Sequence, residues 1–376
     1  MHSPWQHRAF HSQPDLVVVG AGIVGLFIAL FHQRRHPKHR VMVLERAAFP
    51  DGATVRNAGF ACFGSPSELL HDLDKEGETV ALQRAEERWH GLLELRAELG
   101  DEGIGYEATG GHEAFVTGDA LYPLVAEGFE RLNDLMRPIT GTTTFCWADD
   151  LIEHLGLGGV DHLARTEFEG AIDSAKLIRS LMQKAQEEGV LIRGNADVAR
   201  IASDASHVDL ILRDGTVITT ERVAVATNGF TPALMPELDV VPARGQVLLT
   251  APIPALRLRG TFHMNEGFYY FRDCDGGILL GGARHLDVEG ERTMQEGLTS
   301  LIQSDLERLL RDVILPGQEF SIANRWSGTM AFGSAGKTPL VERITDRVAV
   351  AVRLGGMGVA IGIRVARRAA ALLDEA

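Results

Sequence analysis

The apolar residues of the chain fall into short runs separated by polar segments, and the first run begins abruptly at residue 16. Leu16–Val19 and Val41–Leu44 are valine-rich runs of the kind found in strands that are buried on both faces of a parallel sheet. Residues 26–35 between them predict a helix, so this part of the chain predicts a βαβ unit. Similar patterns predict strands at 223–226 and 348–352 and helices at 174–188, capped by Ser174, and at about 359–373.

The segments between these elements carry different patterns. Residues 74–100 are charged and helix-periodic, and residues 120–136 predict a further helix. Residues 208–212 and 217–219 are joined by Asp214 and Gly215, which predicts a β-hairpin. Antiparallel strands are expected at 246–250, 268–271 and 277–280, before a helix at 298–311. The alternation of α/β and strand-rich parts along 376 residues favours two structural lobes.

A glycine-rich turn joins the first predicted strand to the first predicted helix. Its glycines permit a tight turn, close approach of a pyrophosphate and close helix–strand packing. Glu45 ends the next strand, 20 residues after Gly25, where a carboxylate can accept hydrogen bonds from a ribose. The predicted dinucleotide contacts are Gly20, Gly22, Ile23, Val24, Gly25 and Glu45. Arg46 is either a further contact or a solvated charge.

A second glycine cluster lies more than 300 residues downstream, between the strand at 348–352 and the last helix. It comprises Gly355, Gly356, Met357 and Gly358. The start of a helix offers N–H groups and a partial positive charge, so this cluster predicts contact with another polar part of an extended ligand. Such a dipole suits the isoalloxazine ring of a flavin, which gathers negative charge on reduction. A purely structural turn is the alternative.

These signals predict an α/β fold with an α+β insertion. One lobe is a Rossmann-like FAD/NAD(P)-binding unit built from separated segments, and the other is a substrate lobe with a mixed or antiparallel sheet. We expect the nucleotide-binding lobe to comprise residues 14–75, 155–244 and 325–376. We expect the substrate lobe to comprise residues 76–154 and 245–324.

Composition excludes several other classes. The net charge of −14 argues against nucleic acid or an anionic membrane as the main partner. Cys62, Cys146 and Cys274 are too few and too widely spaced for a disulfide framework or a zinc site, and we predict no metal. No apolar run predicts a membrane span, and residues 1–14 do not resemble a signal peptide. A cytoplasmic location is therefore expected.

Five segments together resemble the D-amino acid oxidase superfamily, which includes glycine oxidase, sarcosine oxidase and D-amino acid dehydrogenase. They are the first glycine motif with Glu45, and residues 52–59, 225–229, 241–246 and 355–358. The resemblance covers about Asp15 to Leu373. It implies non-covalent FAD and hydride transfer from the carbon bearing the amine of a small amine or amino acid to flavin N5, with oxygen or another electron acceptor. It also implies cofactor contacts at Thr54, Asn57, Ala58, Gly59, Val198, Thr227, Asn228, Gly229, Gly355, Gly356, Met357, Gly358 and Val359.

The sequence departs from this family where many members hold a substrate carboxylate. The family's arginine follows a Trp-x-Gly motif, but after Trp326 the matching position here is Met330. The substrate is therefore either an amine or a carboxylate bound by another cation, for which Arg272 and Arg284 are candidates. By strand alternation, one of Tyr269 and Tyr270 faces the core and the other can line the pocket. The predicted substrate pocket comprises Tyr269, Tyr270, Arg272, Arg284, Trp326 and Met330, and no catalytic residue is assigned.

Two further departures concern the cofactor. The strand at 277–281 lacks the lysine that assists oxygen in some family oxidases, which favours a dehydrogenase. No cysteine follows Cys274, so the covalent flavin link of sarcosine-oxidase-like members is not expected.

Three other functions remain open at this stage. Ala331-x-x-x-x-Gly336-Lys337-Thr338 fits a relaxed phosphate-loop pattern and would make the protein an NTPase, although Pro339 follows where a helix is required. A non-catalytic FAD-binding redox module and an NAD-dependent dehydrogenase would share the same first glycine motif.

Overall fold

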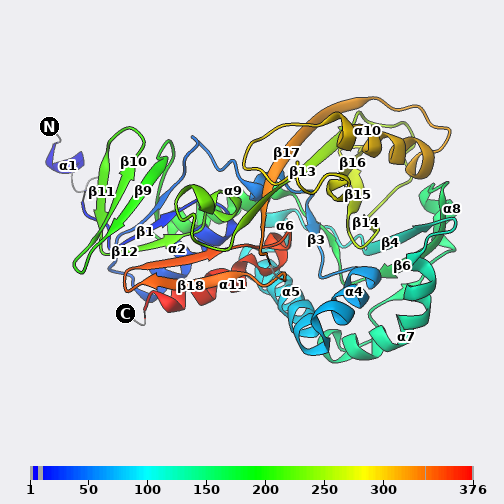
Figure 1. Ribbon diagram of the computed structural model, residues 1–376, viewed down its shortest axis with the longest axis horizontal. Coiled ribbons are helices and arrows are strands. Elements are labelled where there is room, and N and C mark those ends of the chain that lie inside the picture. The colour runs from blue at the N-terminus through cyan, green and yellow to red at the C-terminus, as the bar shows by residue number, and fades with distance from the viewer. Residues whose placement is uncertain (1–2, 7–11, 335, 375–376) are drawn as a thin grey trace.

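The computed structural model describes residues 3–6, 12–334 and 336–374, and Figure 1 shows their arrangement. One centre of the fold is a six-stranded sheet in the order β18-β19-β12-β1-β2-β8. Its strands pair in parallel except for β18, which is antiparallel to β19. They are β1 (Leu16–Val19), β2 (Val41–Leu44), β8 (Leu191–Arg193), β12 (Arg222–Val225), β18 (Leu340–Thr345) and β19 (Val348–Val352).

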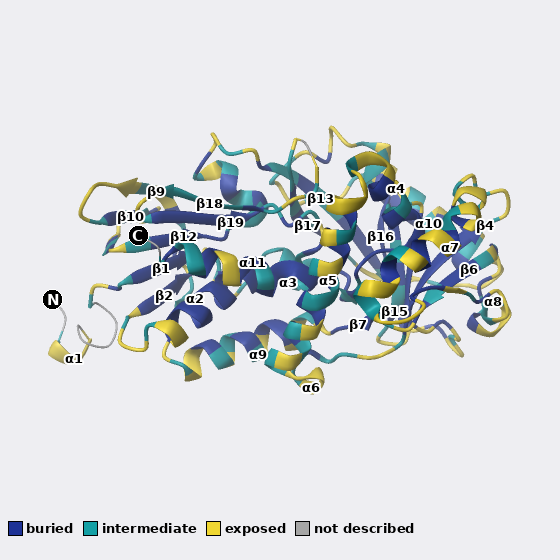
Figure 2. Cartoon of the chain, turned by 90° about the horizontal axis from the view of Figure 1, so that it is seen from below, coloured by how far each residue is buried: buried dark blue, intermediate teal, exposed yellow. Residues whose placement is uncertain are grey.

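The parallel strands are valine-rich because both of their faces are covered. On one face they pack against α2 (Ile23–Arg35), α9 (Ser174–Glu187) and α11 (Gly358–Leu372). On the other face they pack against a three-stranded antiparallel sheet of β9 (Val198–Ser203), β10 (Val208–Leu212) and β11 (Val217–Thr220). The strands β1, β2 and β12 are accordingly dark blue in Figure 2, where buried residues carry that colour.

The second centre is an eight-stranded mixed sheet in the order β17-β13-β16-β15-β14-β4-β6-β5. Only β14 and β4 pair in parallel. The strands are β4 (Gly111–Val116), β5 (Cys146–Trp147), β6 (Val160–Thr166), β13 (Val241–Thr250), β14 (Thr261–Met264), β15 (Tyr269–Cys274), β16 (Gly277–Gly282) and β17 (Ile322–Phe332). Figure 1 shows this sheet on the opposite side of the molecule from β9, β10 and β11.

Helices cover this sheet in two groups. The apolar face of α10 (Ser300–Leu309) packs onto β13 and β16, and a cluster around Phe115 and Phe129 joins β4 to α4 (Pro66–Glu76), α5 (Glu78–Leu99) and α7 (Leu121–Thr140). The remaining elements are α1 (Pro4–Gln6), α3 (Ala53–Arg56), β3 (Phe60–Ala61), α6 (Asp101–Ile104), α8 (Leu151–Leu155), β7 (Gly170–Ala171), and the short turns η2 (Asn228–Ala233), η3 (Arg284–Leu286) and η4 (Leu310–Ile314).

The predicted fold class is confirmed, with corrections to detail. The charged segment 74–100 is two helices divided at Gly77, whose φ of +83° breaks the helical path. The helix at 174 is capped by Asp173, not Ser174, because the Asp173 carboxylate accepts hydrogen bonds from the N–H groups of Ala175 and Lys176. Strand β6 pairs with β4 in the eight-stranded sheet. We therefore propose that the second nucleotide-binding segment begins after Thr166, not at 155.

None of the helices in the described part of the chain combines the length and the apolar character that a membrane crossing requires.

Candidate active site

A cavity of about 630 Å³ is bordered by residues of both large sheets and of the loops that connect them. That volume lies in the range typical of cofactor and substrate sites. Of the residues predicted to contact the cofactor or substrate, those that border it are Gly20, Gly22, Ile23, Val24, Glu45, Arg46, Thr54, Asn57, Ala58, Val198, Thr227, Asn228, Tyr270, Arg284, Met330, Gly355, Gly356, Met357, Gly358 and Val359.

One end of the cavity is formed where β1 passes into α2. Gly20 has φ +106°, and a Cβ atom there would lie 2.8 Å from the carbonyl oxygen of Ala226. A Cβ atom on Gly25 would lie 1.9 Å from the carbonyl oxygen of Gly20, so Gly25 lets the helix pack on the turn but does not itself border the cavity. At Gly22 the nearest atom to such a Cβ is the Thr54 hydroxyl oxygen, at 3.2 Å. Gly22 therefore leaves the room that a phosphate group needs.

The carboxylate of Glu45 is buried at the end of β2. One of its oxygens accepts a hydrogen bond from the N–H of Ala21 (3.1 Å) and the other from that of Ala47 (3.2 Å). These bonds orient the carboxylate beside the glycine turn. Arg46 lies with its guanidinium carbon 3.7 Å from the centroid of the Phe230 ring, and both residues border the cavity.

The start of α11 opens into the same cavity. Gly355 and Gly356 have φ +55° and +81°, a left-handed turn that precedes the helix. The side-chain oxygen of Asn228 accepts hydrogen bonds from the N–H groups of Arg353 (3.2 Å) and Leu354 (3.3 Å). Asn228 thereby fixes the loop that presents Met357 and Gly358 to the cavity.

Two predicted contacts, Gly59 and Gly229, support the wall without bordering the cavity. A Cβ atom on Gly59 would lie 2.4 Å from the carbonyl oxygen of Ile172, and one on Gly229 would lie 2.5 Å from that of Met330. Asn57 borders the cavity, but its side chain is engaged within the protein. It accepts from the N–H of Gly59 (2.7 Å) and donates to the carbonyl oxygen of Thr54 (2.7 Å).

These features fit an extended dinucleotide. Helix starts supply N–H groups and partial positive charge at two places in one cavity, and a buried carboxylate stands at the end of the second parallel strand. The residues that would hold FAD are therefore present, with Gly20, Gly22 and Glu45 at the adenosine and pyrophosphate side and Met357 to Val359 at the flavin side.

The substrate candidates divide into two sets. Tyr270, Met330 and Arg284 border the cavity, whereas Tyr269, Arg272 and Trp326 do not. Alternation along β15 explains the tyrosine pair, since the Tyr269 ring packs in the core and its hydroxyl donates to Asp305 (2.6 Å).

The side chain of Met330 is placed by two glycines. A Cβ atom on Gly356 would lie 3.8 Å from the Met330 sulfur, and one on Gly245 would lie 3.0 Å from its methyl carbon. Met330 thus lies between the loop before α11 and β13.

Arg272 and Trp326 are corrections to the predicted pocket. One Arg272 nitrogen donates to the carbonyl oxygens of Gly59 and Ile172, both at 2.9 Å, so this guanidinium ties loops together. The indole N–H of Trp326 donates to the carbonyl oxygen of Arg56 (3.0 Å). Each polar group therefore has a structural partner within the protein.

Of the two arginines predicted to bind a substrate carboxylate, Arg284 is the one that remains for a ligand. It follows β16 and borders the cavity, and its guanidinium makes no hydrogen bond or ion pair with any residue in the described part of the chain. Burial lowers its pKa, and the charge of the nearby Glu291 opposes that shift. The Glu291 carboxylate itself is bound by Arg244 at 2.8 Å. Burial also raises the pKa of Tyr270 to about 12, so its hydroxyl stays protonated as a donor.

A charged cluster at the same cavity was not predicted from the sequence. Glu68 binds Arg88 (2.8 Å) and lies 3.6 Å from Lys337, which in turn binds Asp72 (2.7 Å). Burial alone would raise the pKa of Glu68, but the charges of Arg88 and Lys337 hold it down at about 2. His263 also borders the cavity, and burial lowers its pKa to about 4. These residues belong to different elements and carry no local motif.

The structure around Lys337 excludes the phosphate-loop alternative. The loop around it is followed by Pro339 and strand β18, not by the helix that a phosphate loop requires. Its ammonium group is engaged by the carboxylates of Glu68 and Asp72.

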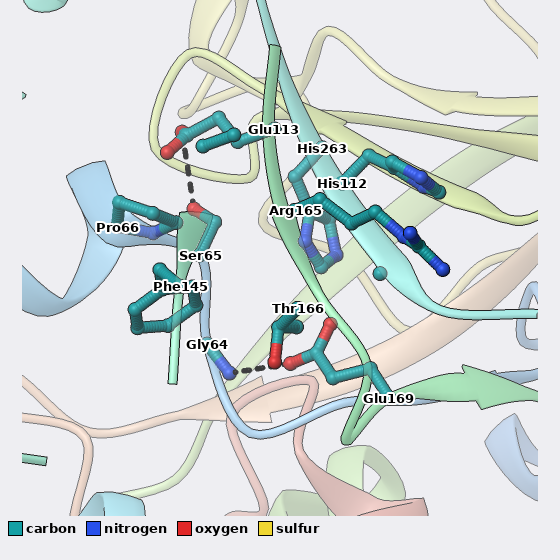
Figure 3. Close-up of a pocket in the computed structure, with 12 residues that line it drawn as sticks. Gly64, Ser65, Pro66, His112, Glu113, Phe145, Arg165, Thr166, Glu169 and His263 are labelled. Carbon is teal, nitrogen blue, oxygen red and sulfur yellow. Dashed lines mark hydrogen bonds between the residues drawn. The ribbon is translucent and has the colours of Figure 1, made fainter. Parts of the chain in front are cut away.

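A second, very small cavity of about 10 Å³ lies behind His263, which borders both cavities. Figure 3 shows Glu113 bonded to Ser65 and Glu169 bonded to the N–H of Gly64. Both carboxyl groups are buried, and desolvation raises the pKa of each to about 7. The space suits a single water molecule.

Comparisons with known proteins agree with this geometry. Residues 15–372 match the family described as "FAD dependent oxidoreductase". The chain is similar to the tRNA 5-methylaminomethyl-2-thiouridine biosynthesis bifunctional protein MnmC of Idiomarina loihiensis. The two are 26% identical over 50% of this chain, and the match spans only 30% of that protein's length.

Solved structures of similar fold include L-proline dehydrogenase from P. horikoshii, with a TM-score of 0.77 and 18% identity over 96% of this chain and 94% of that one. Another is glycine oxidase from Geobacillus kaustophilus, with a TM-score of 0.75 and 20% identity over 96% and 95%. At these identities the likeness shows the fold. Together with the family match over nearly the whole chain, it leads to one conclusion: this chain belongs to the DAO family of FAD-dependent oxidoreductases.

Proposed function

We propose that this protein oxidises the carbon–nitrogen bond of a small amino acid whose carboxylate is bound by Arg284. The observation that carries this proposal is the Arg284 guanidinium, which borders the cavity and has no carboxylate partner among the described residues. Arginine binds carboxylates through two parallel hydrogen bonds, and partial burial strengthens such a pair. When bound, FAD supplies the chemistry by accepting a hydride from the carbon that bears the amine.

The residues of this chain bind and orient the substrate. Arg284 fixes the carboxylate, and the protonated hydroxyl of Tyr270 is available to donate to the same group. Met330 presents an apolar side chain between the Gly356 loop and β13, which limits water beside the reacting carbon. Orientation and exclusion of water are the contributions that such a reaction requires of the protein.

The similar structures support an amino-acid substrate. Their names describe a proline dehydrogenase, a glycine oxidase and an iminodiacetate oxidase from a Chelativorans species, each of which acts on a compound that carries both an amine and a carboxylate. Non-covalent binding of FAD is part of the proposal, since Cys62, the cysteine that borders the cavity, is half-buried and lies beside Arg88.

A second candidate is an amine without a carboxylate. Met330 favours it, because an apolar side chain stands at the position where many relatives have an arginine. In that case the guanidinium of Arg284 would not bind the substrate.

An anaerobic screen separates these functions. The purified protein is mixed with amino acids, N-methyl amino acids and carboxylate-free amines, and loss of flavin absorbance is followed. Bleaching by amino acids but not by the matching amines supports the proposal, whereas the reverse supports the second candidate. No bleaching by either class would support the non-catalytic redox module. Reoxidation of the bleached protein with oxygen or with an artificial quinone then identifies the kind of acceptor.

A further inference from the structure

Three histidines lie close together at the end of α2, well away from the active-site cavity. His32 and His36 are one helical turn apart and therefore share a face of the helix, and their ring centroids are 4.5 Å apart. His39 follows the helix, and its Nδ1 lies 3.0 Å from Nε2 of His32. The cavity begins at the opposite end of α2, at Gly22 and Ile23.

The segment that follows α11 brings a carboxylate to this cluster. One oxygen of Asp374 lies 2.8 Å from Nε2 of His36 and 3.8 Å from Nδ1 of His32. In Figures 1 and 2 the C-terminal end lies on the side of the molecule away from the eight-stranded sheet. Nδ1 of His32, Nε2 of His36 and this oxygen of Asp374 all lie within 4.8 Å of one another.

The imidazole of His32 is the second, independent observation. The residue has no solvent exposure, and its Nδ1 has no hydrogen-bond partner in the described part of the chain. A buried polar atom without a partner is uncommon, and a bound ion would supply the missing partner. Here that atom points into the space shared with His36 and Asp374.

We propose that His32, His36 and Asp374 form a site for a divalent transition-metal ion, with Zn²⁺ as the best fit. Two imidazole nitrogens and one carboxylate oxygen are a common zinc ligand set, and water completes a fourth position. Mg²⁺ and Ca²⁺ prefer oxygen ligands, so this nitrogen-rich set disfavours them. Tetrahedral zinc with bonds of about 2.0–2.1 Å separates its ligand atoms by roughly 3.3 Å, which the present 2.8 and 3.8 Å bracket.

The surroundings orient the ligands. If Nε2–H of His32 donates to His39, the lone pair on Nδ1 of His32 is free for a metal, which is the usual second contact of a metal-binding histidine. Arg35 binds the other oxygen of Asp374 at 2.5 Å and leaves the first oxygen available. The Arg35 charge opposes a cation, whereas the carbonyl end of α2 favours one.

Bound metal would join the last turn of α2 to the segment after α11. Both helices begin at the FAD cavity, so the ion would fix their far ends relative to each other. The role that follows is structural, and it does not depend on which substrate the enzyme oxidises.

Titration calorimetry with ZnCl₂ on the FAD-loaded protein tests the site. The protein is prepared without an affinity tag and stripped with EDTA, and His2, His7 and His11 are replaced by alanine so that they cannot contribute. We expect one equivalent of Zn²⁺ to bind with micromolar or tighter affinity. His36→Ala and Asp374→Asn should each weaken binding by about tenfold or more. Zn²⁺ should also raise the melting temperature of the parent protein but not that of these two variants.

His207→Ala is the matched control, because His207 also lies beside two carboxylates, Asp204 and Asp209, but belongs to no such cluster. Its Zn²⁺ affinity should equal that of the parent. His36 and Asp374 are partly exposed, so their variants should keep the parent's flavin spectrum and its melting temperature in EDTA. The proposal would be overturned if Zn²⁺ did not bind, if both variants kept the parent's Zn²⁺ affinity, or if the parent bound Mg²⁺ as tightly as Zn²⁺.

Discussion

The guanidinium group of Arg284 lies over the ring of Phe332, with its central carbon 4.7 Å from the ring centroid, where both residues border the large cavity. The aromatic face supports the cation without supplying a negative charge. A substrate carboxylate that reaches Arg284 would therefore meet a positioned cation that no other carboxylate of the described residues has already bound.

Replacement of Arg284 should slow the oxidation of substrates that carry a carboxylate more than that of substrates without one. For Arg284→Gln we expect kcat/KM for the best amino acid to fall by roughly 10–100-fold, which corresponds to a charged hydrogen-bonded contact of about 1.5–3 kcal/mol. The matching amine without a carboxylate should lose little. Steady-state kinetics provide the measurement, and Arg292→Gln on the same loop is the control. An equal loss for the amine would mean that Arg284 acts on the fold of the pocket and not on the carboxylate.

Substitution of the two glycines Gly22 and Gly25 of the first motif should affect different properties of the protein. At Gly25 an added methyl group would lie 1.9 Å from a backbone oxygen, so Gly25→Ala should lower the free energy of unfolding of the FAD-free protein by about 1–3 kcal/mol or more. At Gly22 the nearest atom is 3.2 Å away, so Gly22→Ala should keep that stability but weaken FAD binding by about tenfold or more. Urea unfolding and fluorescence titration with FAD measure the two effects. Similar behaviour of both variants would contradict this assignment.

The buried carboxyl group of Glu169 should make stability depend on pH. Burial raises its pKa from the ordinary 4.5 to about 7, so the folded protein keeps a proton that the unfolded chain releases. The stabilisation from this group is complete below about pH 4.5 and is lost as the pH rises to about 7. The loss should be at most roughly 3 kcal/mol.

Glu169→Gln imitates the protonated form and should flatten that part of the profile. Glu113 contributes a similar dependence, which should remain in the variant. Urea unfolding between pH 5 and pH 8 measures the slope, and Glu167→Gln, at an exposed neighbouring position, should behave like the parent. An unchanged slope in Glu169→Gln would rule out this group as the origin.

Cysteine reactivity should follow burial. Burial raises the pKa of the Cys62 thiol to about 12, so almost none of the reactive thiolate is present at pH 8, whereas Cys146 is exposed. We expect iodoacetamide to modify Cys146 in the folded protein and to modify Cys62 only after unfolding in urea. Mass spectrometry of the peptides shows the order, and faster labelling of Cys62 would show that its surroundings stabilise the thiolate.

The nucleotide end of the cavity could be predicted because its determinants are local. Gly20, Gly22 and Glu45 lie within one strand–helix–strand unit, and steric limits on the turn select glycine there. Strand alternation likewise predicted that one of Tyr269 and Tyr270 faces the core, although not which one.

The substrate end could not be predicted in the same way. Arg272 lies on the same face of β15 as Tyr270, yet its guanidinium binds carbonyl oxygens of two loops. Only the paths of those distant segments decide this contact. Glu68, Arg88 and Lys337 meet from α4, α5 and a loop near the end of the chain. Their pairing depends on tertiary packing, which no local spacing encodes.

The cavity takes its two helix starts from α2, near the beginning of the chain, and α11, near its end. During synthesis a ribosome therefore releases the first glycine turn long before the second exists. Until β19 and α11 have been translated, α2 lacks α11 as a packing neighbour and the flavin side of the cavity lacks part of its wall. Capture of FAD must therefore follow the translation of α11, and a shortage of flavin would leave the cavity between the two sheets filled with water.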